Sequence, residues 1–288
     1  VAGAGLTAFA AMPAQAQDGA GDALVLGTIT VEGARETGTG PVDGLVATVS
    51  ATGMKTDTPI SETPQTINVV PAQQVTETGA QSIPEALGYT PGVSQSYGYT
   101  MRTGDQIQIR GFEIWNTMRD GMTYSINTYD GQQEPYGLER IEVLKGAPSV
   151  LYGNIRPGGI VNSISKRPPP ERFGEFNIEG GSWDWKQMSA DVGGPLDDKG
   201  VWSYRLTGLY RDANTFIDYI PNDRRYLAGA LKWQPSARTS LTFLSEYQHD
   251  DTASFSAILP AVGVVLPNVN GTIPRERFMG EPDYDRYR

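Results

Sequence analysis

The sequence predicts an α+β domain, a small mixed sheet with short helices, followed by the first strands of a transmembrane antiparallel β-barrel that is truncated. Two observations predict this order. A glycine-punctuated module between Leu138 and Pro168 combines strand and turn signals. From Phe173 onward, segments with two-residue alternation are separated by turn signals. The predicted domain boundaries are residues 57–168 for the first domain and 172–288 for the barrel strands.

The module from Leu138 to Pro168 contains two predicted strands with a compact connection. Isoleucine and valine alternate with charge over Arg140–Leu144, and a Gly-Ala-Pro-Ser break leads into one helical turn that ends at Gly153. A Pro-Gly-Gly turn follows, and the second strand spans Ile160–Ser165. The module offers no nucleophile with a base, no pair of catalytic carboxylates and no metal-ligand cluster. The residues alone therefore indicate a packed structural unit and not an active site.

Upstream of this module, the sequence predicts further elements of the same domain. A strand over Gln65–Val70 follows Pro64, which favours an edge position because proline cannot donate to a ladder. Pro71–Leu87 has a helical pattern that divides at Ser82, a capping residue ahead of a second helix. Gln106–Arg110 alternates isoleucine and glutamine as a further strand. These segments complete the predicted mixed sheet.

The C-terminal part of the chain contains five segments that alternate apolar and polar residues. In the third segment, Trp202, Leu206 and Tyr210 fall on one face, whereas Arg205 and Arg211 fall on the other. An apolar outer face with a polar inner face is typical of a lipid-exposed barrel, although a soluble sheet with one buried face has the same periodicity. The segments are Glu175–Gly180, Gln187–Gly193, Val201–Asp212, Tyr226–Trp233 and Ser240–His249.

The connections between these segments favour the barrel. Short connections at residues 195–200 and 234–239 alternate with longer ones at 214–225 and from 250 onward, as in barrels with short inner turns and long outer loops. Barrels with a plugged lumen have about 22 strands, so we expect this chain to be a fragment that is truncated at both ends. Tryptophans lie at segment ends, where aromatic girdles occur: Trp183, Trp185, Trp202 and Trp233.

Composition and the N-terminus limit the function further. The net charge of −10 argues against nucleic acid as a partner, and the absence of cysteine excludes disulfides and thiolate metal sites. Residues 1–16 end in Ala-Gln-Ala, similar to the remnant of an export signal with its cleavage site. Residues 17–56 are flexible linkers around one β-branched run, Leu24–Val31. This run either adds to a partner's sheet edge or is a frayed edge strand of the next domain.

The module at Leu138–Pro168, together with Ile-Arg-Gly-Phe at Ile109–Phe112, resembles the core of the plug domain of TonB-dependent outer-membrane receptors. The resemblance implies a plug inside a barrel in the outer membrane of a Gram-negative cell, with no enzymatic activity and no covalently bound cofactor. It also implies that a TonB box lies in the periplasm and binds TonB by β-strand addition. The residues of the implied TonB box are Thr28, Ile29, Thr30 and Val31.

The last loop, Ile258–Tyr287, resembles the third extracellular loop of ferric-hydroxamate receptors in its Leu-Pro and Pro-Asn-x-Asn-Gly sequences. This resemblance implies a ferric siderophore, of hydroxamate type, as the ligand. Cobalamin or a glycan as cargo, and a non-transport β-rich binding module, are the alternatives. An arginine with tyrosines suits an iron complex wrapped in organic oxygens, although these aromatics are equally suited to packing under the barrel wall. The candidate ligand-binding residues are Tyr97, Tyr99, Arg102, Tyr124, Tyr129 and Phe255.

Two arginines, Arg110 and Arg140, carry a further expectation. The resemblance implies that both point from the plug sheet into the barrel wall, where glutamates on strands beyond Arg288 lock them. A guanidinium in an occluded interface needs such a partner, because an unpaired buried charge costs several kcal/mol. The alternative is that Arg140 pairs locally with Glu139 or Glu142 as an exposed strand charge, worth under about 1 kcal/mol.

Overall fold

A computed structural model describes residues 36–96, 104–114, 117–125, 131–253, 259–281 and 285–287 of the chain. The residues from Glu36 onward form one compact unit. The predicted export-signal remnant and the implied TonB box lie outside the described residues. Below, "plug" denotes the described residues up to 168, and "wall" denotes the strands that follow.

The plug consists of short strands and helices in an order close to the predicted one. Within the described residues, no helix is long and apolar enough to cross a membrane. The elements in chain order are β1 (Val49–Ser50), β2 (Thr58–Pro59), η1 (Ile60–Glu62), β3 (Thr66–Pro71), α1 (Ala72–Thr78), α2 (Ile83–Ala86), β4 (Val93–Gln95), β5 (Ile107–Ile109), β6 (Phe112–Ile114), β7 (Thr117–Arg119), β8 (Met122–Ser125), η3 (Pro135–Gly137), β9 (Leu138–Lys145), α3 (Ser149–Tyr152) and β10 (Gly159–Ser165).

The two helices begin and end where local chemistry favours it. Gly79 ends α1 in the left-handed conformation, with φ of 63°, which glycine adopts without steric cost. The Ser82 side chain accepts a hydrogen bond from the backbone N–H of Glu85 and so caps α2. The predicted division of the helical pattern at Ser82 is therefore confirmed.

A five-stranded mixed sheet, in the order β3-β9-β10-β7-β8, forms the centre of the plug. β9 and β10 are antiparallel, whereas β10 and β7 are parallel. β3 lies at an edge, as expected from Pro64. A Cβ on Gly159 would lie 2.1 Å from the carbonyl oxygen of Leu144, so the turn into β10 requires glycine at this position.

The strand predicted over Gln106–Arg110 forms, but it does not join the central sheet. β5 pairs with β4 and β6 in a separate antiparallel sheet of three strands. The β5–β6 turn has Arg110 and Gly111 at positive φ, 52° and 83°. Two positive φ values in a two-residue turn match the twist of a hairpin. Alternation thus predicts the strand correctly but does not identify its partner strand.

The plug core lies between the central sheet and the helices. Ile141 and Val143 of β9 pack with Ile83 and Leu87 around α2, and all four are completely buried. Nearly every residue of β9 and β10 is buried. Both faces of these strands are therefore covered, which encloses their charged and polar residues together with the apolar ones.

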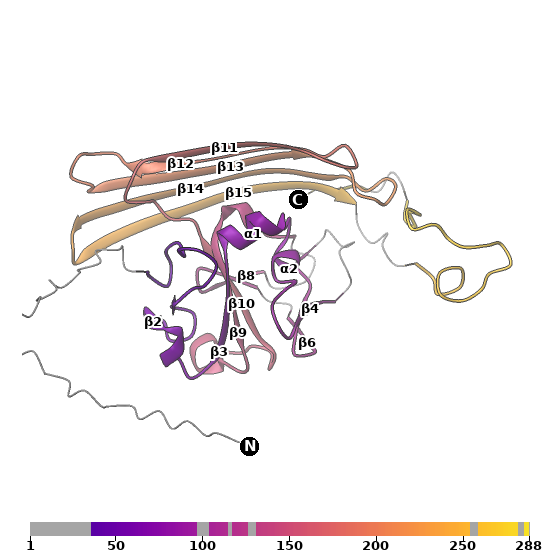
Figure 1. The fold of residues 1–288 in the computed structure, drawn as a ribbon, viewed down its shortest axis with the longest axis horizontal. Helices are drawn as coiled ribbons and strands as arrows, with labels where there is room; N and C mark the ends of the chain where they lie inside the picture. Colours follow the sequence, from indigo (N-terminus) through magenta and orange to yellow (C-terminus); the bar gives the residue numbers. More distant parts are fainter. Residues whose placement is uncertain are drawn as a thin grey trace, which may run out of the picture. The chain divides into compact units, whose positions relative to one another are not determined.

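The C-terminal strands form one antiparallel sheet in sequence order (Figure 1). The five longer strands correspond to the five predicted segments, and β14 and β15 extend to 15 residues each. Strands of that length span roughly 50 Å, enough for a tilted crossing of a hydrocarbon core of about 30 Å. The bounds are β11 (Phe173–Gly180), β12 (Lys186–Pro195), β13 (Trp202–Asp212), β14 (Asn222–Ser236), β15 (Thr239–Ala253) and β16 (Asp285–Tyr287).

Side chains of the wall alternate between an exposed apolar face and a polar face that meets the plug. On β13, Leu206 and Tyr210 are 46% and 47% exposed, whereas Arg211 is 2% exposed. At the opposite end of this strand, Trp202 lies across from Trp233 with ring centroids 6.1 Å apart. The predicted alternation of apolar and polar faces is confirmed.

Candidate functional site

Charged side chains join the plug to the wall at three neighbouring places. Each place combines a charged group of the plug with opposite charges on the wall strands. We name them after the plug residue at the centre of each: the Glu134 network, the Glu139 network and the Arg119 network.

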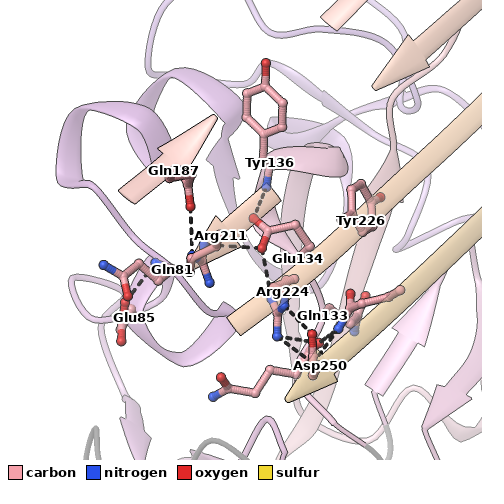
Figure 2. A network of polar contacts seen from close by, with 12 residues as sticks. Gln81, Glu85, Gln133, Glu134, Tyr136, Gln187, Arg211, Arg224, Tyr226 and Asp250 are labelled. Atoms are coloured by element: carbon pink, nitrogen blue, oxygen red, sulfur yellow. Dashed lines mark hydrogen bonds and ion pairs between the residues drawn. The ribbon is translucent and has the colours of Figure 1, made fainter. Parts of the chain in front are cut away.

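Figure 2 shows the contacts of the Glu134 network. Its charged members, Glu134, Arg211, Arg224 and Asp250, are buried. Oε1 of Glu134 accepts a hydrogen bond from the backbone N–H of Tyr136 at 3.0 Å. Oε2 lies 2.9 Å from Nη1 of Arg224 and 3.5 Å from Nη2 of Arg211. Arg224 also contacts both carboxylate oxygens of Asp250, at 2.6 and 2.8 Å. This bidentate pair fixes the guanidinium in the orientation that meets the plug carboxylate.

Further side chains from the wall complete the Glu134 network. Nε of Arg211 donates to Oε1 of Gln187 at 2.8 Å, and the guanidinium lies 4.6 Å from the ring centroid of Trp185. Nε2 of Gln248 donates to the backbone carbonyl of Gln132 at 2.7 Å. Wall strands β12, β13, β14 and β15 therefore all contribute to a network around one short plug segment.

The Glu139 network lies next to it. Oε2 of Glu139 is 2.9 Å from Nη1 of Arg205. Arg205 also contacts both carboxylate oxygens of Asp191, at 3.0 and 2.8 Å. The plug residue Lys166 lies 2.7 Å from Asp191, and its Nζ is 4.2 Å from the ring centroid of Tyr136. Negative and positive groups thus alternate along this network, from Glu139 through Arg205 and Asp191 to Lys166, so each of the four charges has a partner of opposite sign.

The Arg119 network contains a carboxylate with three donors. Nη1 of Arg119 is 2.6 Å from Glu246 of β15, and Nε donates to Ser165 at 2.8 Å. The hydroxyls of Tyr226 and Tyr124 donate to the two oxygens of Glu246 at 3.0 and 2.8 Å. Burial and the charge of Glu246 raise the pKa of the Tyr124 phenol, which keeps the proton that it donates.

Gly137 brings the plug backbone into contact with the wall. A Cβ at this position would lie 1.8 Å from the hydroxyl oxygen of Tyr226 and 2.5 Å from the ring carbon that carries it. Tyr226 is itself 4% exposed. The space between plug and wall therefore admits no side chain at residue 137.

Asp105 is a buried carboxyl group beside the Glu134 network. Its Oδ2 accepts a hydrogen bond from the backbone N–H of Gln133 at 2.9 Å, whereas Oδ1 has no hydrogen-bond partner among the described residues. Burial raises the pKa of Asp105 to about 7, and the backbone hydrogen bond and the charge of Arg224 offset only part of this effect. This carboxyl group is therefore protonated in a large share of molecules near neutral pH.

Most of the predicted ligand and TonB-box residues lie outside the described residues, and their roles stay predictions. Only Tyr124 is described: its ring is partly exposed and its hydroxyl binds Glu246 of the wall. The residues that lie outside are Tyr97, Tyr99, Arg102, Tyr129 and Phe255 for the ligand, and Thr28, Ile29, Thr30 and Val31 for the TonB box.

The two arginines of the expected plug lock are described, but the glutamates expected to pair with them belong to strands beyond Arg288, so the lock stays a prediction. Arg110 is exposed in the β5–β6 turn. Arg140 is completely buried inside the plug, 3.5 Å from Glu142, and does not reach the described part of the wall. The physical reason is that neighbouring residues of a strand face opposite sides, so Glu139 faces the wall and Arg140 faces away. The local alternative named Glu142 as a partner but expected an exposed pair.

Sequence reasoning missed the plug residues that do contact the wall. Glu134, Glu139 and Arg119 stand in no motif that distinguishes them from surface charges. The available signal was on the wall, where Arg205 and Arg211 occupy polar-face positions of a strand expected to surround the plug. Arginines that face a plug inside a barrel require carboxylates on its surface.

The arrangement is suited to holding two parts of the protein together. Within the described residues, no group of three or more histidine, aspartate or glutamate side chains could hold a metal ion. Four charged groups of the plug, Glu134, Glu139, Lys166 and Arg119, each pair with an opposite charge of the wall. Chemically, this interface keeps the plug seated until those pairs are separated.

Known proteins share this architecture. Residues 59–160 match the family model of the TonB-dependent receptor plug domain. The chain is 41% identical over 252 residues to the ferrichrome outer membrane transporter/phage receptor of Escherichia coli (strain K12), a match that covers 85% of this chain and 34% of that protein. It is 35% identical over 245 residues to the ferrioxamine B receptor of Salmonella typhimurium (strain SL1344), covering 83% of this chain and 35% of that protein.

The fold is also similar to that of a solved receptor. The ferripyoverdine receptor of the outer membrane of Pseudomonas aeruginosa, bound to ferripyoverdine, is 30% identical with a TM-score of 0.65, over 71% of this chain and 28% of that chain. The chain spans about a third of the length of the curated relatives that it matches. The plug, the wall strands and these relatives together show that the chain belongs to the TonB-dependent outer-membrane receptor family.

Proposed function

We propose that the whole protein binds a ferric siderophore, of hydroxamate type, outside the cell and imports it when TonB acts on the TonB box. The observation that carries this proposal is the plug held against the wall by three networks of paired charges. Such an interface closes a barrel at rest and can open when energy is supplied. The names of two relatives, receptors of ferrichrome and of ferrioxamine B, support a hydroxamate as the ligand.

The ligand-binding residues belong to this proposal. In the sequence, Tyr97, Tyr99 and Arg102 fall in one short segment and Tyr129 in another, and Phe255 precedes the loop that resembles ferric-hydroxamate receptors. A guanidinium and phenol groups donate hydrogen bonds to the organic oxygens around iron, while the rings cover the apolar body of the complex. The siderophore is the cargo and the lipid of the outer membrane surrounds the wall. The proposal includes no hydrolytic or redox activity, no covalently bound cofactor and no nucleic acid.

Uptake by cells tests the cargo. Iron-starved cells that lack their own siderophore receptors, with or without the complete gene, are given radiolabelled ferric ferrichrome, ferric ferrioxamine B, cyanocobalamin or maltooligosaccharide. We expect gene-dependent uptake of at least one ferric hydroxamate, abolished when the proton gradient is collapsed. Uptake of only cobalamin or the glycan would leave the receptor but replace its cargo. The absence of energy-dependent uptake of any of the four would contradict the proposal.

A proline in the TonB box tests the coupling. Ile29→Pro removes a backbone donor and fixes φ, so strand addition to TonB should fail while binding of ferric ferrichrome to whole cells is retained. Ala20→Pro, in the linker ahead of the box, is the matched control and should transport normally. Normal transport by the Ile29→Pro receptor would show that the box lies elsewhere.

A further inference from the structure

One side chain holds the segment between Glu36 and Val49 against the central sheet. Nε and Nη2 of Arg140 donate to the carbonyl oxygen of Gly40 at 3.0 and 2.6 Å, and Nη1 donates to that of Val49 at 2.9 Å. The carbonyl oxygen of Thr37 accepts a further bond from Nη2. The guanidinium of Arg140 therefore donates hydrogen bonds to three backbone carbonyls of one segment. The Arg140 side chain is completely buried.

The same segment is closed on itself by Glu36. Oε1 of Glu36 lies 3.4 Å from Nη1 of Arg140, while Oε2 accepts from both the N–H and the hydroxyl of Thr48. The N–H of Gly38 donates to the Asp57 carboxylate at 2.9 Å. Glu36 thus joins the start of the segment to its end and joins both to Arg140.

This segment is the first part of the chain that the structure describes, and it lies close in sequence to the proposed TonB box. The compact unit begins at Glu36, and the proposed TonB box ends five residues earlier at Val31. The segment ends in β1, which is two residues long and, among the described strands, pairs only with the equally short β2. Among the described contacts, the hydrogen bonds of Arg140 and the one between Ser50 and Glu142 connect residues 36–50 to strand β9.

We propose that Arg140 is a clasp that keeps residues 36–50 on the resting plug, and that these residues are the first to leave when TonB pulls. The source of the pull rests on the proposed function, whereas the clasp is a property of the resting receptor. When residues 36–50 leave, Glu142 also loses the hydrogen bond that the Ser50 hydroxyl donates to it at 2.7 Å. The pair of Arg140 and Glu142 then meets water beside β9, so departure of the segment opens one face of the central sheet.

Hydrogen exchange on the full-length receptor in lipid nanodiscs, without ligand and without TonB, tests the clasp. Arg140→Lys keeps the charge beside Glu142 but removes the planar fork that reaches several carbonyls at once. We expect exchange in peptides covering residues 36–50 to become at least tenfold faster, while the amides of β9 and β10 keep their protection. The reporter amides are those of Gly38 and Thr48, which are hydrogen bonded in the parent protein.

A second variant loosens the same segment without touching the arginine. A Cβ on Gly38 would lie 2.4 Å from the backbone nitrogen of Ala51, the residue that follows the segment, so Gly38→Ala forces the start of the segment away from its end. We expect the same local increase in exchange as for Arg140→Lys. The control is Arg238→Lys, the same substitution at an exposed position in the β14–β15 turn, which should leave exchange unchanged.

The outcomes separate the clasp from the transport function. Parent-like exchange over residues 36–50 in Arg140→Lys would overturn the clasp, as would an equal increase across β9 and β10, since that would indicate general loosening of the plug. Neither result depends on a cargo. A receptor that showed the expected exchange but no uptake of any siderophore would retain the clasp and lose the proposed function.

Discussion

Strand β9 of the plug and strand β13 of the wall have similar patterns in sequence but different surroundings. Residues 140–143 of β9 and residues 202–207 of β13 alternate apolar residues with charged or polar ones. In β13 the pattern matches burial, because one face meets the plug and the other is exposed. In β9 it does not, because seven consecutive residues are buried. Alternation therefore reports which residues share a face, but not whether that face meets water.

The two strands also differ in the direction of their charged side chains. The wall carries Arg224 and Arg205 on the face toward the plug, where each meets a plug carboxylate across the interface. β9 carries Glu139 toward the wall and Arg140 with Glu142 into the plug interior. A buried charge on either strand is tolerated because it is paired, and removal of one partner is far more costly than removal of an exposed charge.

The largest loss of plug stability is expected from substitution of Arg224, and its neighbour Arg225, on the opposite face of β14, supplies the control. Arg224→Ala leaves Glu134 and Asp250 buried without their shared guanidinium and should destabilise the seated plug by about 3–5 kcal/mol. Arg225→Ala, at the next and exposed position, should change it by less than about 0.5 kcal/mol. Urea unfolding of the plug within the full-length receptor measures both. Equal effects of the two substitutions would contradict the assignment of faces.

A smaller effect, on the pH dependence of stability, is expected at Asp105, whose carboxyl group contacts no guanidinium of the described residues directly. Because its folded pKa of about 7 exceeds the unfolded value, its contribution to stability is complete at pH below about 4 and is lost as the pH rises through about 7. The full loss is up to roughly 4 kcal/mol. Asp105→Asn should flatten this part of the stability–pH curve, whereas Asn at the exposed Asp198 should not. An unchanged curve in Asp105→Asn would refute the buried, protonated carboxyl.

The contact between Gly137 and Tyr226 tests the junction of plug and wall without involving a charged group. Gly137→Ala places a methyl group within 1.8 Å of the Tyr226 hydroxyl and should cost about 1–3 kcal/mol of plug stability. Adding Tyr226→Ala should recover part of that loss, because the colliding ring is gone, so the two substitutions are coupled in a double-mutant cycle. Strictly additive effects would mean that the two residues do not touch.

The smallest effect is expected for Tyr124→Phe. It removes one hydrogen bond to Glu246, worth about 1 kcal/mol, and leaves the ring in place. If the hydroxyl serves only the wall, the affinity for ferric ferrichrome stays at the parent value in a whole-cell binding assay. A tenfold loss of affinity with unchanged plug stability would instead assign the hydroxyl to the ligand.

The sequence was sufficient for elements whose environment is periodic. The strands of the wall, the division of the helical pattern at Ser82 and the edge position of β3 all follow from local patterns. The placement of β5 in a second sheet and the inward direction of Arg140 do not, because both depend on partners distant in the chain. For the same reason, Glu134 and Glu139 could not be distinguished from surface carboxylates before their wall arginines were located.

The contact between Gly137 and Tyr226 also limits how receptors of this family can be recombined. A plug transferred into the barrel of another receptor must bring glycine to a position where the new wall carries a large ring, or the wall must carry a smaller residue there. Matching the charged networks alone would not be sufficient, since side chains can reorient but a backbone that touches a ring cannot.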